Sequence, residues 1–340
     1  MGNTWLITGG AGFIGSNFIR YVIDTRPDVS LINLDALTYS GNLENLAGLD
    51  DHPRHEFVRG DIRDPDLVRS VVERADAVVH MAAESHVDRS ILDSKPFIDT
   101  NVGGTQVLLD QTRHAGDKRF LYVSTDEVYG SLPLDNPNER FTEDTPLAPN
   151  SPYAASKTAG DLLARAYHHT FGMDIVTTRC SNNFGPYQFP EKVIPLFVTN
   201  LMEGHQVPLY GDGLNVRDWL HVLDHCEAIA LVLERGRTGE VYNVGGNNER
   251  NNLELTRSIL ELMGKSEGMI RHVTDRPGHD RRYAIDAGKI ERELGWRPTR
   301  SAWPDALRDT VEWYKANETW WRRVKSGEYR DYYERQYAGR

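Results

Sequence analysis

Short apolar runs alternate with longer amphipathic segments through the first half of the chain. The short runs have the length and the β-branched content of strands, and three longer segments, Ser16–Asp24, Pro65–Arg74 and Val102–His114, repeat apolar residues every third or fourth position as helices do. The candidate strands are Thr4–Thr8, Ser30–Asp35, Glu56–Arg59, Ala77–Met81, Phe120–Ser124 and Asp174–Arg179. This alternation predicts an α/β fold built on a Rossmann-type, doubly wound parallel sheet.

The second half of the chain predicts a smaller α/β substrate-binding domain. Ser151 and Pro152 are typical of a helix start, and the helix that follows would carry Tyr153 to His169. Beyond Asn182 the pattern loosens, but one further apolar run, Glu240–Val244, has the length of a strand that returns to the first sheet. We therefore expect interleaved domains, with residues 1–183 and 217–246 in the Rossmann domain and residues 184–216 and 247–330 in the smaller one.

Composition narrows the class of protein. The chain has 39 Lys and Arg against 50 Asp and Glu, a net charge of −11, so we expect no nucleic-acid partner. We attribute the aromatic and basic residues from Trp313 to Tyr337 to the packing of a terminal helix. Two cysteines, Cys180 and Cys226, lie outside any metal-ligand or disulfide spacing, so no metal is predicted. Without a signal-like start or an apolar run of roughly 18 residues, we expect no membrane association and a cytoplasmic location.

Glycines follow the first candidate strand directly and open the first candidate helix. Gly9, Gly10, Gly12 and Gly15 fit the loop in which a tight backbone turn lets helix N–H groups approach a pyrophosphate. Asp35 ends the second strand about 20 residues later, where a carboxylate accepts hydrogen bonds from a ribose and repels a 2′-phosphate. The motif therefore predicts NAD in preference to NADP; the alternative is a glycine turn with a surface aspartate.

Tyr153 and Lys157 stand four residues apart, hence on one face of the predicted helix. An ammonium group close to a phenol favours the phenolate, so we expect Lys157 to lower the pKa of Tyr153 and to make it a base for a substrate hydroxyl. A positively charged nicotinamide acts in the same direction. The alternative is a contact on the helix surface.

Thr125, Asp126 and Glu127 come directly after the Phe120–Ser124 strand, at the sheet edge where open α/β folds place their chemistry. Two close carboxyls resist ionising together, so one can stay protonated as an acid while the other acts as a base. The alternative is a solvated acidic turn or a helix cap.

Five segments together resemble a known family: Thr8–Gly15, Ala82–Asp88, Thr125–Gly130, Tyr153–Lys157 and Asp275–Asp280. They look like the extended short-chain dehydrogenases/reductases and, within these, the family of dTDP-glucose 4,6-dehydratases, over nearly the whole chain. The Thr-Asp-Glu triplet is the most informative segment, because related nucleotide-sugar 4-epimerases lack the acid pair and GDP-mannose dehydratases typically have Ser-Glu.

The resemblance implies a redox-neutral reaction with dTDP-glucose as substrate and NAD as cofactor. Tyr153, aided by Thr125 and Lys157, would take the sugar 4-hydroxyl proton while NAD accepts the C4 hydride. Glu127 would then remove the C5 proton as Asp126 protonates the departing 6-hydroxyl. The hydride returns to C6, which gives a 4-keto-6-deoxy sugar.

The resemblance also supplies the binding residues. From their positions after the third and fourth strands, Asp61 and Ile62 could hold the adenine, and Ala82 and Ala83 leave room for the ribose-phosphate; small residues there are equally consistent with tight packing. The residues expected to hold NAD are Gly9, Gly12, Phe13, Ile14, Gly15, Asp35, Asp61, Ile62, Ala82, Ala83, Thr100, Tyr153, Lys157 and Asn183. Those expected to hold the nucleotide sugar are Ser85, Thr125, Asn182, Lys192, Val193, Ile194, Pro195, Leu196, Pro208, Leu209, Tyr210, Arg217, Asn252, Asp275, Arg276, Pro277, Gly278 and His279.

Three other functions stay open at this point: a dehydratase that accepts UDP-glucose, a nucleotide-sugar 4-epimerase, and a non-catalytic NAD sensor. A homodimer is the family expectation. The segments Val102–His114 and Tyr153–Tyr167 support it, since their apolar residues extend beyond one narrow stripe.

Overall fold

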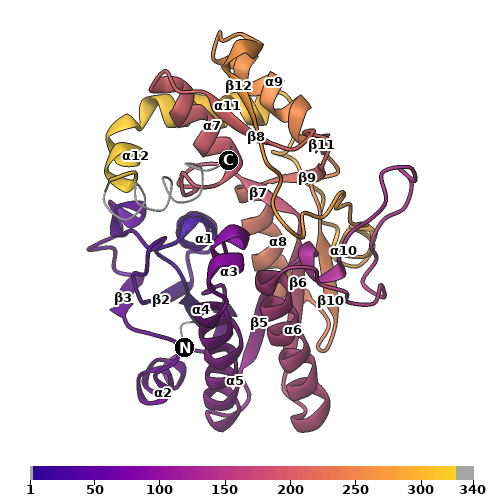
Figure 1. The fold of residues 1–340 in the computed structure, drawn as a ribbon. Coiled ribbons are helices and arrows are strands. Elements are labelled where there is room, and N and C mark those ends of the chain that lie inside the picture. Colours follow the sequence, from indigo (N-terminus) through magenta and orange to yellow (C-terminus); the bar gives the residue numbers. More distant parts are fainter. Residues whose placement is uncertain (1–2, 327–340) are drawn as a thin grey trace.

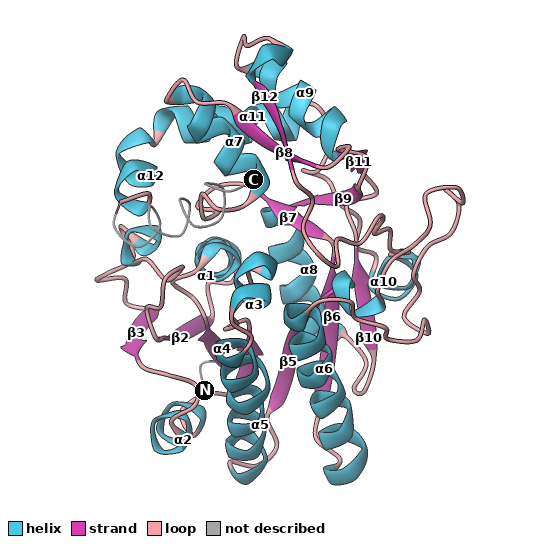
Figure 2. Ribbon diagram, viewed as in Figure 1, coloured by secondary structure: helices cyan, strands magenta, loops and turns pink. Residues whose placement is uncertain are grey.

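A computed structural model describes residues 3–326 and places seven strands in one sheet (Figures 1 and 2). The strand order is β10-β6-β5-β4-β1-β2-β3, and every neighbouring pair is parallel. Since β1 lies between β2 and β4, the connections run outward in both directions from it, which confirms the predicted doubly wound fold. The strands are β1 Asn3–Thr8, β2 Val29–Asp35, β3 His55–Arg59, β4 Ala77–His80, β5 Arg119–Thr125, β6 Ile175–Cys180 and β10 Val241–Val244.

Helices cover both faces of this sheet. Successive strand residues point to opposite faces, so Leu6 packs in one apolar core with α2, α5 and α6, whereas Trp5 and Ile7 pack in another with α1 and α8. The helices of this part are α1 Phe13–Thr25, α2 Pro65–Val72, α3 Val87–Leu92, α4 Lys95–Phe97, α5 Thr105–His114, α6 Pro152–Phe171, α8 Val222–Arg235 and α10 Gly288–Leu294, with the short turns η1 Leu43–Leu46 and η3 Asp126–Tyr129.

A smaller region lies beyond the carboxyl ends of the strands, at the upper end of the molecule in Figure 1. It has two small sheets, one of order β11-β9-β7 and one that pairs β12 with β8, and a core of its own that includes Phe184, Trp219 and Trp321. Its elements are β7 Asn182–Phe184, α7 Val193–Met202, β8 Val207–Tyr210, β9 Val216–His221, β11 Glu249–Asn251, α9 Asn252–Leu262, η4 Glu267–Met269, β12 Ile270–Val273, α11 Asp305–Ala316 and α12 Glu318–Val324.

The chain passes between the two regions several times. β9 pairs in the small sheet, whereas α8 and β10, which follow it, pack and pair in the large part. The predicted domain limits stay a prediction, and their residues 1–2 and 327–330 lie outside the described residues. α12 packs its two tryptophans inward, and the Trp320 indole donates to Asn45 Oδ1 at 2.9 Å. The part of the aromatic tail beyond residue 326 lies outside the described residues as well.

One helix departs from the sequence pattern. Where we expect a regular helix from Val102, the chain forms a π-helix over Ile98–Gly104 (η2) before α5 begins. The side chain of Asn101 accepts from the Glu84 N–H and donates to the Glu84 carbonyl, both at 2.9 Å, which ties this turn to the loop after β4. The spacing of apolar residues within one segment cannot predict such tertiary contacts. Turns of π-helix are frequent at functional sites.

Candidate active site

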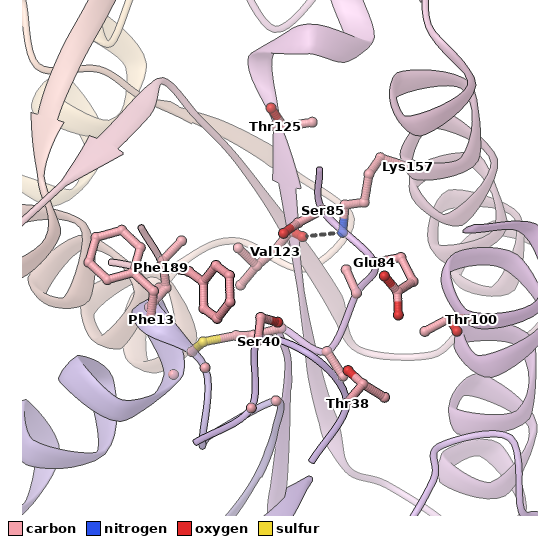
Figure 3. Close-up of a pocket in the computed structure, with 18 of the residues that line it drawn as sticks. Phe13, Thr38, Ser40, Glu84, Ser85, Thr100, Val123, Thr125, Lys157 and Phe189 are labelled. Carbon is pink, nitrogen blue, oxygen red and sulfur yellow. Dashed lines mark hydrogen bonds between the residues drawn. The ribbon is translucent and has the colours of Figure 1, made fainter. Parts of the chain in front are cut away.

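A cavity of about 370 Å³ lies at the carboxyl ends of β1, β2, β4, β5 and β6, the edge where the sequence places its chemistry. Figure 3 shows part of its lining, with Thr38 and Ser40 on one side, Lys157 and Thr125 on the other, and Phe13 and Phe189 close together. The cavity wall contains all the residues expected to hold NAD and all five expected to be catalytic. One space therefore joins the glycine loop to the acid pair.

The glycine loop is shaped for close approach of a ligand. Gly9 has φ +75°, and a Cβ on it would lie 2.8 Å from the backbone of Ala82; a Cβ on Gly15 would lie 2.2 Å from the Gly9 carbonyl oxygen. No side chain caps the first turn of α1, which begins after Gly12. Uncapped N–H groups at a helix start favour a phosphate, so this loop fits the pyrophosphate of NAD.

Asp35 holds the same loop from the end of β2. Its Oδ2 accepts from the Ala11 N–H at 2.9 Å and its Oδ1 from the Leu37 N–H at 2.8 Å. Burial raises the pKa of this carboxyl, and the two backbone bonds oppose the rise. Each oxygen keeps acceptor capacity for a ribose hydroxyl, and a buried carboxylate disfavours a 2′-phosphate.

Tyr153 and Lys157 lie at the centre of the cavity wall. The Lys157 ammonium donates to the Val123 carbonyl at 2.8 Å (Figure 3) and lies 4.3 Å from the centre of the Tyr122 ring. Burial lowers the pKa of Lys157 to about 8. The pKa of Tyr153 is raised well above its usual value, first by burial and then by Glu127. Our expectation that Lys157 lowers the Tyr153 pKa is therefore not met by the protein groups alone, because burial and the nearby carboxyls act in the opposite direction.

The acid pair lies in η3, directly after β5. The Thr125 hydroxyl caps this turn by accepting from the Glu127 N–H at 3.3 Å. The Asp126 side chain is buried, and its Oδ2 has no hydrogen-bond partner among residues 3–326. Burial, with the charge of Glu127 second, raises the pKa of Asp126 well above its usual value. Asp126 is therefore suited to carry a proton at neutral pH.

Glu127 has a different surrounding. Burial raises its pKa, but Arg276, Lys192 and Arg217 all act to lower it. These cations come from three distant parts of the sequence and converge on one carboxyl. Arg217 also acts to lower the pKa of Asp126, but Arg276 and Lys192 add to its effect on Glu127, so Glu127 is the acid better suited to act as the base.

The residues expected to hold the nucleotide sugar fall into three groups: those in the cavity wall, those of α7 and β8, and those between β9 and the loop after β12. Ser85, Thr125, Asn182 and Lys192 line the cavity, and the Lys192 ammonium donates to the Ser85 carbonyl at 2.9 Å. Ile194, Leu196 and Leu209 have buried side chains, the first two in the core of the smaller region, whereas Val193 is only partly buried. The α7 and β8 residues of the prediction are Val193, Ile194, Pro195, Leu196, Pro208, Leu209 and Tyr210.

The prediction also includes residues outside the cavity wall, two of which contact Asp88. Tyr210 donates its hydroxyl proton to Asp88 Oδ2 at 3.0 Å, and Arg276 donates to Asp88 Oδ1 at 3.3 Å. Asp275 and His279 bond each other at 2.6 Å in the loop after β12. The others expected here are Arg217, Asn252, Pro277 and Gly278. Their contacts with a substrate stay a prediction.

Sequence reasoning missed several lining residues. Thr38 and Ser40 follow Asp35 in the loop after β2, and Glu84 lies between predicted residues, so their positions were a usable signal. Phe189 and Glu191 lie in an irregular segment with no motif, and nothing in the sequence indicated them. Among residues 3–326, no group of three or more His, Cys, Asp or Glu side chains could hold a metal, and no helix is long and apolar enough to cross a membrane.

Comparison with known proteins identifies close relatives. Residues 6–304 match the family model described as GDP-mannose 4,6 dehydratase. The dTDP-glucose 4,6-dehydratase of Streptomyces niveus is 56% identical over 325 residues, which cover 94% of this chain and 95% of that protein.

Solved structures agree. The dTDP-glucose 4,6-dehydratase of Streptomyces venezuelae, solved with NAD and TYD bound, has a TM-score of 0.92 and 55% identity, over 95% of this chain and 100% of that chain. The enzyme of Bacillus anthracis, in complex with NAD, has a TM-score of 0.89 and 52% identity, with the same coverage of both chains. The fold and the site define an extended short-chain dehydrogenase/reductase with a nucleotide-sugar dehydratase site. Within that class, the chain belongs to the dTDP-glucose 4,6-dehydratase family.

Proposed function

We propose that this protein converts dTDP-glucose to dTDP-4-keto-6-deoxy-glucose with loss of water, using bound NAD. The observation that carries the proposal is the difference between two neighbouring acids in one cavity with Tyr153 and Lys157: Asp126 has a raised pKa and an Oδ2 without a hydrogen-bond partner among residues 3–326, whereas three cations act to lower the pKa of Glu127. A 4-epimerase has no need of such an acid pair.

In the oxidation step, the Tyr153 oxygen takes the proton of the 4-hydroxyl. Thr125 hydrogen-bonds the same region of the sugar, and Lys157 is fixed beneath it by Val123. When bound, NAD supplies the acceptor for the C4 hydride, the donor that returns it to C6, and a positive charge that favours the Tyr153 phenolate. Gly9, Gly12, Gly15 and Asp35 would hold it.

In the elimination step, the new C4 carbonyl makes the C5 proton acidic. Glu127 takes this proton, the electron pair of the broken C5–H bond forms the C5–C6 double bond, and the C6–O bond breaks. Asp126 gives its proton to the departing 6-hydroxyl, which leaves as water. The protonated Glu127 is then placed to return a proton to C5 when hydride arrives at C6.

The cations explain how a protein of net charge −11 can hold a nucleoside diphosphate. Arg276, Lys192 and Arg217 lie close enough to Glu127 to act on its pKa, so a local positive field exists beside the hexose site. A guanidinium group can donate two parallel hydrogen bonds to the oxygens of a phosphate. The sugar would then be anchored from the end opposite its C6.

The test is product identity. Purified protein with NAD is incubated with dTDP-glucose and, separately, with UDP-glucose, and the products are analysed by mass spectrometry. We expect a product lighter by one water, formed faster from dTDP-glucose. A product of unchanged mass that is inverted at C4 would indicate an epimerase, and cofactor binding without turnover of either sugar would indicate a sensor.

We further propose that two copies associate through the outer side of α3, η2 and α6. Leu92, Ile98 and Leu162 are 66%, 50% and 49% exposed there, and these elements pack against one another. Light scattering should show a dimer that Leu162→Asp converts to a monomer. The control is Leu214→Asp, the same substitution at a leucine that is 44% exposed in the smaller region, and it should leave the mass unchanged. A monomeric parent protein would refute the proposal.

A cytoplasmic location stays a prediction, which cell fractionation would test.

A further inference from the structure

A buried ion pair lies beneath the site, and the reaction as described makes no use of it. Arg179 of β6 and Asp161 of α6 have side chains that are 6% and 2% exposed. The guanidinium donates twice to the carboxylate, from Nε to Oδ2 at 2.8 Å and from Nη2 to Oδ1 at 2.9 Å. Desolvating two charges offsets much of their attraction, so stability alone is a weak reason for such a pair.

One end of the pair is attached to the helix that carries the oxidation residues. Asp161 follows Lys157 by four residues and Tyr153 by eight, so all three lie on one face of α6. The Asp161 charge also acts to raise the pKa of Lys157.

The other end is attached to the turn that carries the acid pair. Arg179 Nη1 donates to the Tyr129 hydroxyl at 2.9 Å, and that hydroxyl donates to Asn243 Oδ1 at 2.8 Å. Tyr129 is the last residue of η3, the turn that begins with Asp126. Burial raises the pKa of Tyr129 to about 12, so its hydroxyl keeps the proton that it donates.

We propose that Arg179 and Tyr129 are positioning residues that fix the acid turn of Asp126 and Glu127 relative to the Tyr153–Lys157 helix. The inference rests on the proposed function. In the proposed reaction C4 of the hexose meets groups on the helix and C5 and C6 meet groups on the turn, so one sugar reaches both sets only if their separation is held to a fraction of an ångström. A misplacement of about 1 Å can cost a catalysed step about 10²-fold.

The two sets of groups are not equally dependent on this link. Lys157 is also held by its bond to the Val123 carbonyl, and its own carbonyl accepts from the Tyr122 hydroxyl at 3.2 Å. Removing the Tyr129 hydroxyl should therefore leave the oxidation residues in place and loosen the acid turn alone. The expected result is a change in the balance between oxidation and elimination, which a general loss of stability would not produce.

The test is Tyr129→Phe in the NAD-loaded enzyme. This change keeps the ring, which stacks on Phe141 with centroids 5.0 Å apart, and removes only the hydroxyl. The matched control is Tyr242→Phe in strand β10, which removes a part-buried hydroxyl that donates to Glu293 of α10 at 2.9 Å and accepts from the Arg237 N–H at 3.0 Å, without a hydrogen bond to the acid turn. Single-turnover absorbance measures NADH formation and decay with dTDP-glucose, and quenched samples analysed by mass spectrometry measure water loss.

We expect Tyr129→Phe to form NADH at a rate within about twofold of the parent and to lose water about 10-fold more slowly, so that NADH accumulates. Tyr242→Phe should keep the parent balance of the two rates. Equal slowing of both steps in Tyr129→Phe, or water loss at the parent rate, would overturn the positioning role while leaving the proposed function intact. Failure of the parent enzyme itself to form NADH would instead reject the proposed function.

Discussion

Replacing Asp126 by asparagine tests its proposed role as proton donor separately from any role in holding the structure. Asp126 is 1% exposed, and burial raises its pKa well above 3.8, which favours the neutral acid over the carboxylate. Asparagine has nearly the same shape and is neutral too. The substitution therefore removes the transferable proton and little else.

The expected loss of activity follows from the role of a general acid. Positioned proton transfer contributes about 10²- to 10⁴-fold to a rate, so elimination should slow by that factor, which is about 2.7 to 5.5 kcal/mol of barrier. Oxidation at C4 does not involve Asp126, so NADH should form at close to the parent rate and persist.

Whereas Asp126→Asn should slow elimination, it should make the folded protein more stable near neutral pH. A carboxyl whose folded pKa is raised binds more protons folded than unfolded, so the folding free energy is most favourable below the unfolded pKa near 3.8 and weakens as pH rises toward the folded pKa. Asparagine does not titrate. The melting temperature of Asp126→Asn, compared with that of the parent, should therefore rise as pH increases from about 4 to 7.

The assay pairs a pH series of thermal melts with stopped-flow absorbance of NADH. Asp135→Asn, the same change at an exposed position, is the control and should alter neither quantity. Water loss at the parent rate in Asp126→Asn would refute the acid role. A melting difference that shrinks with rising pH would refute the claim that Asp126 is held in its neutral form.

Two further predictions concern binding. Gly9→Ala should abolish cofactor retention, since the position has φ +75° and a Cβ there would lie 2.8 Å from the Ala82 backbone; protein that still carries NAD through gel filtration would contradict this. Arg276→Gln should raise KM for dTDP-glucose about 10- to 100-fold with a smaller effect on kcat, as expected for the loss of a charged hydrogen bond to phosphate; an unchanged KM in steady-state assays would place the diphosphate elsewhere.

Local motifs carried most of the prediction of the site. Gly9, Gly12, Gly15 and the Tyr153–Lys157 pair were predicted from spacings within one turn or helix and Asp35 from its distance along the chain from that turn, and all of them line the cavity. The acid pair was identified because residues that follow a parallel strand end at the active edge of the sheet. Such relations are visible in a sequence because short-range geometry determines them.

Long-range relations were not visible in the same way. Arg276, Lys192 and Arg217 were expected to hold the nucleotide sugar, but their combined action on the pKa of Glu127 depends on the folded chain. We expected Lys157 to lower the pKa of Tyr153, but in the protein without cofactor that pKa is raised, because the sequence shows the nearby lysine and not the burial. The π-helix at Ile98–Gly104 was missed for the same reason, since its cause is the contact of Asn101 with Glu84.

The central claim is that one enzyme moves hydrogen from C4 to C6 of the same sugar while paired carboxyls remove water between C5 and C6. The most direct measurement is NMR and mass analysis of the product of two reactions. One uses dTDP-glucose labelled with deuterium at C4 in ordinary water, and the other uses unlabelled dTDP-glucose in heavy water. The account predicts the C4 label at C6 and solvent deuterium at C5. A label that stays at C4, or a product that keeps its 6-hydroxyl and gains no solvent deuterium at C5, would contradict it.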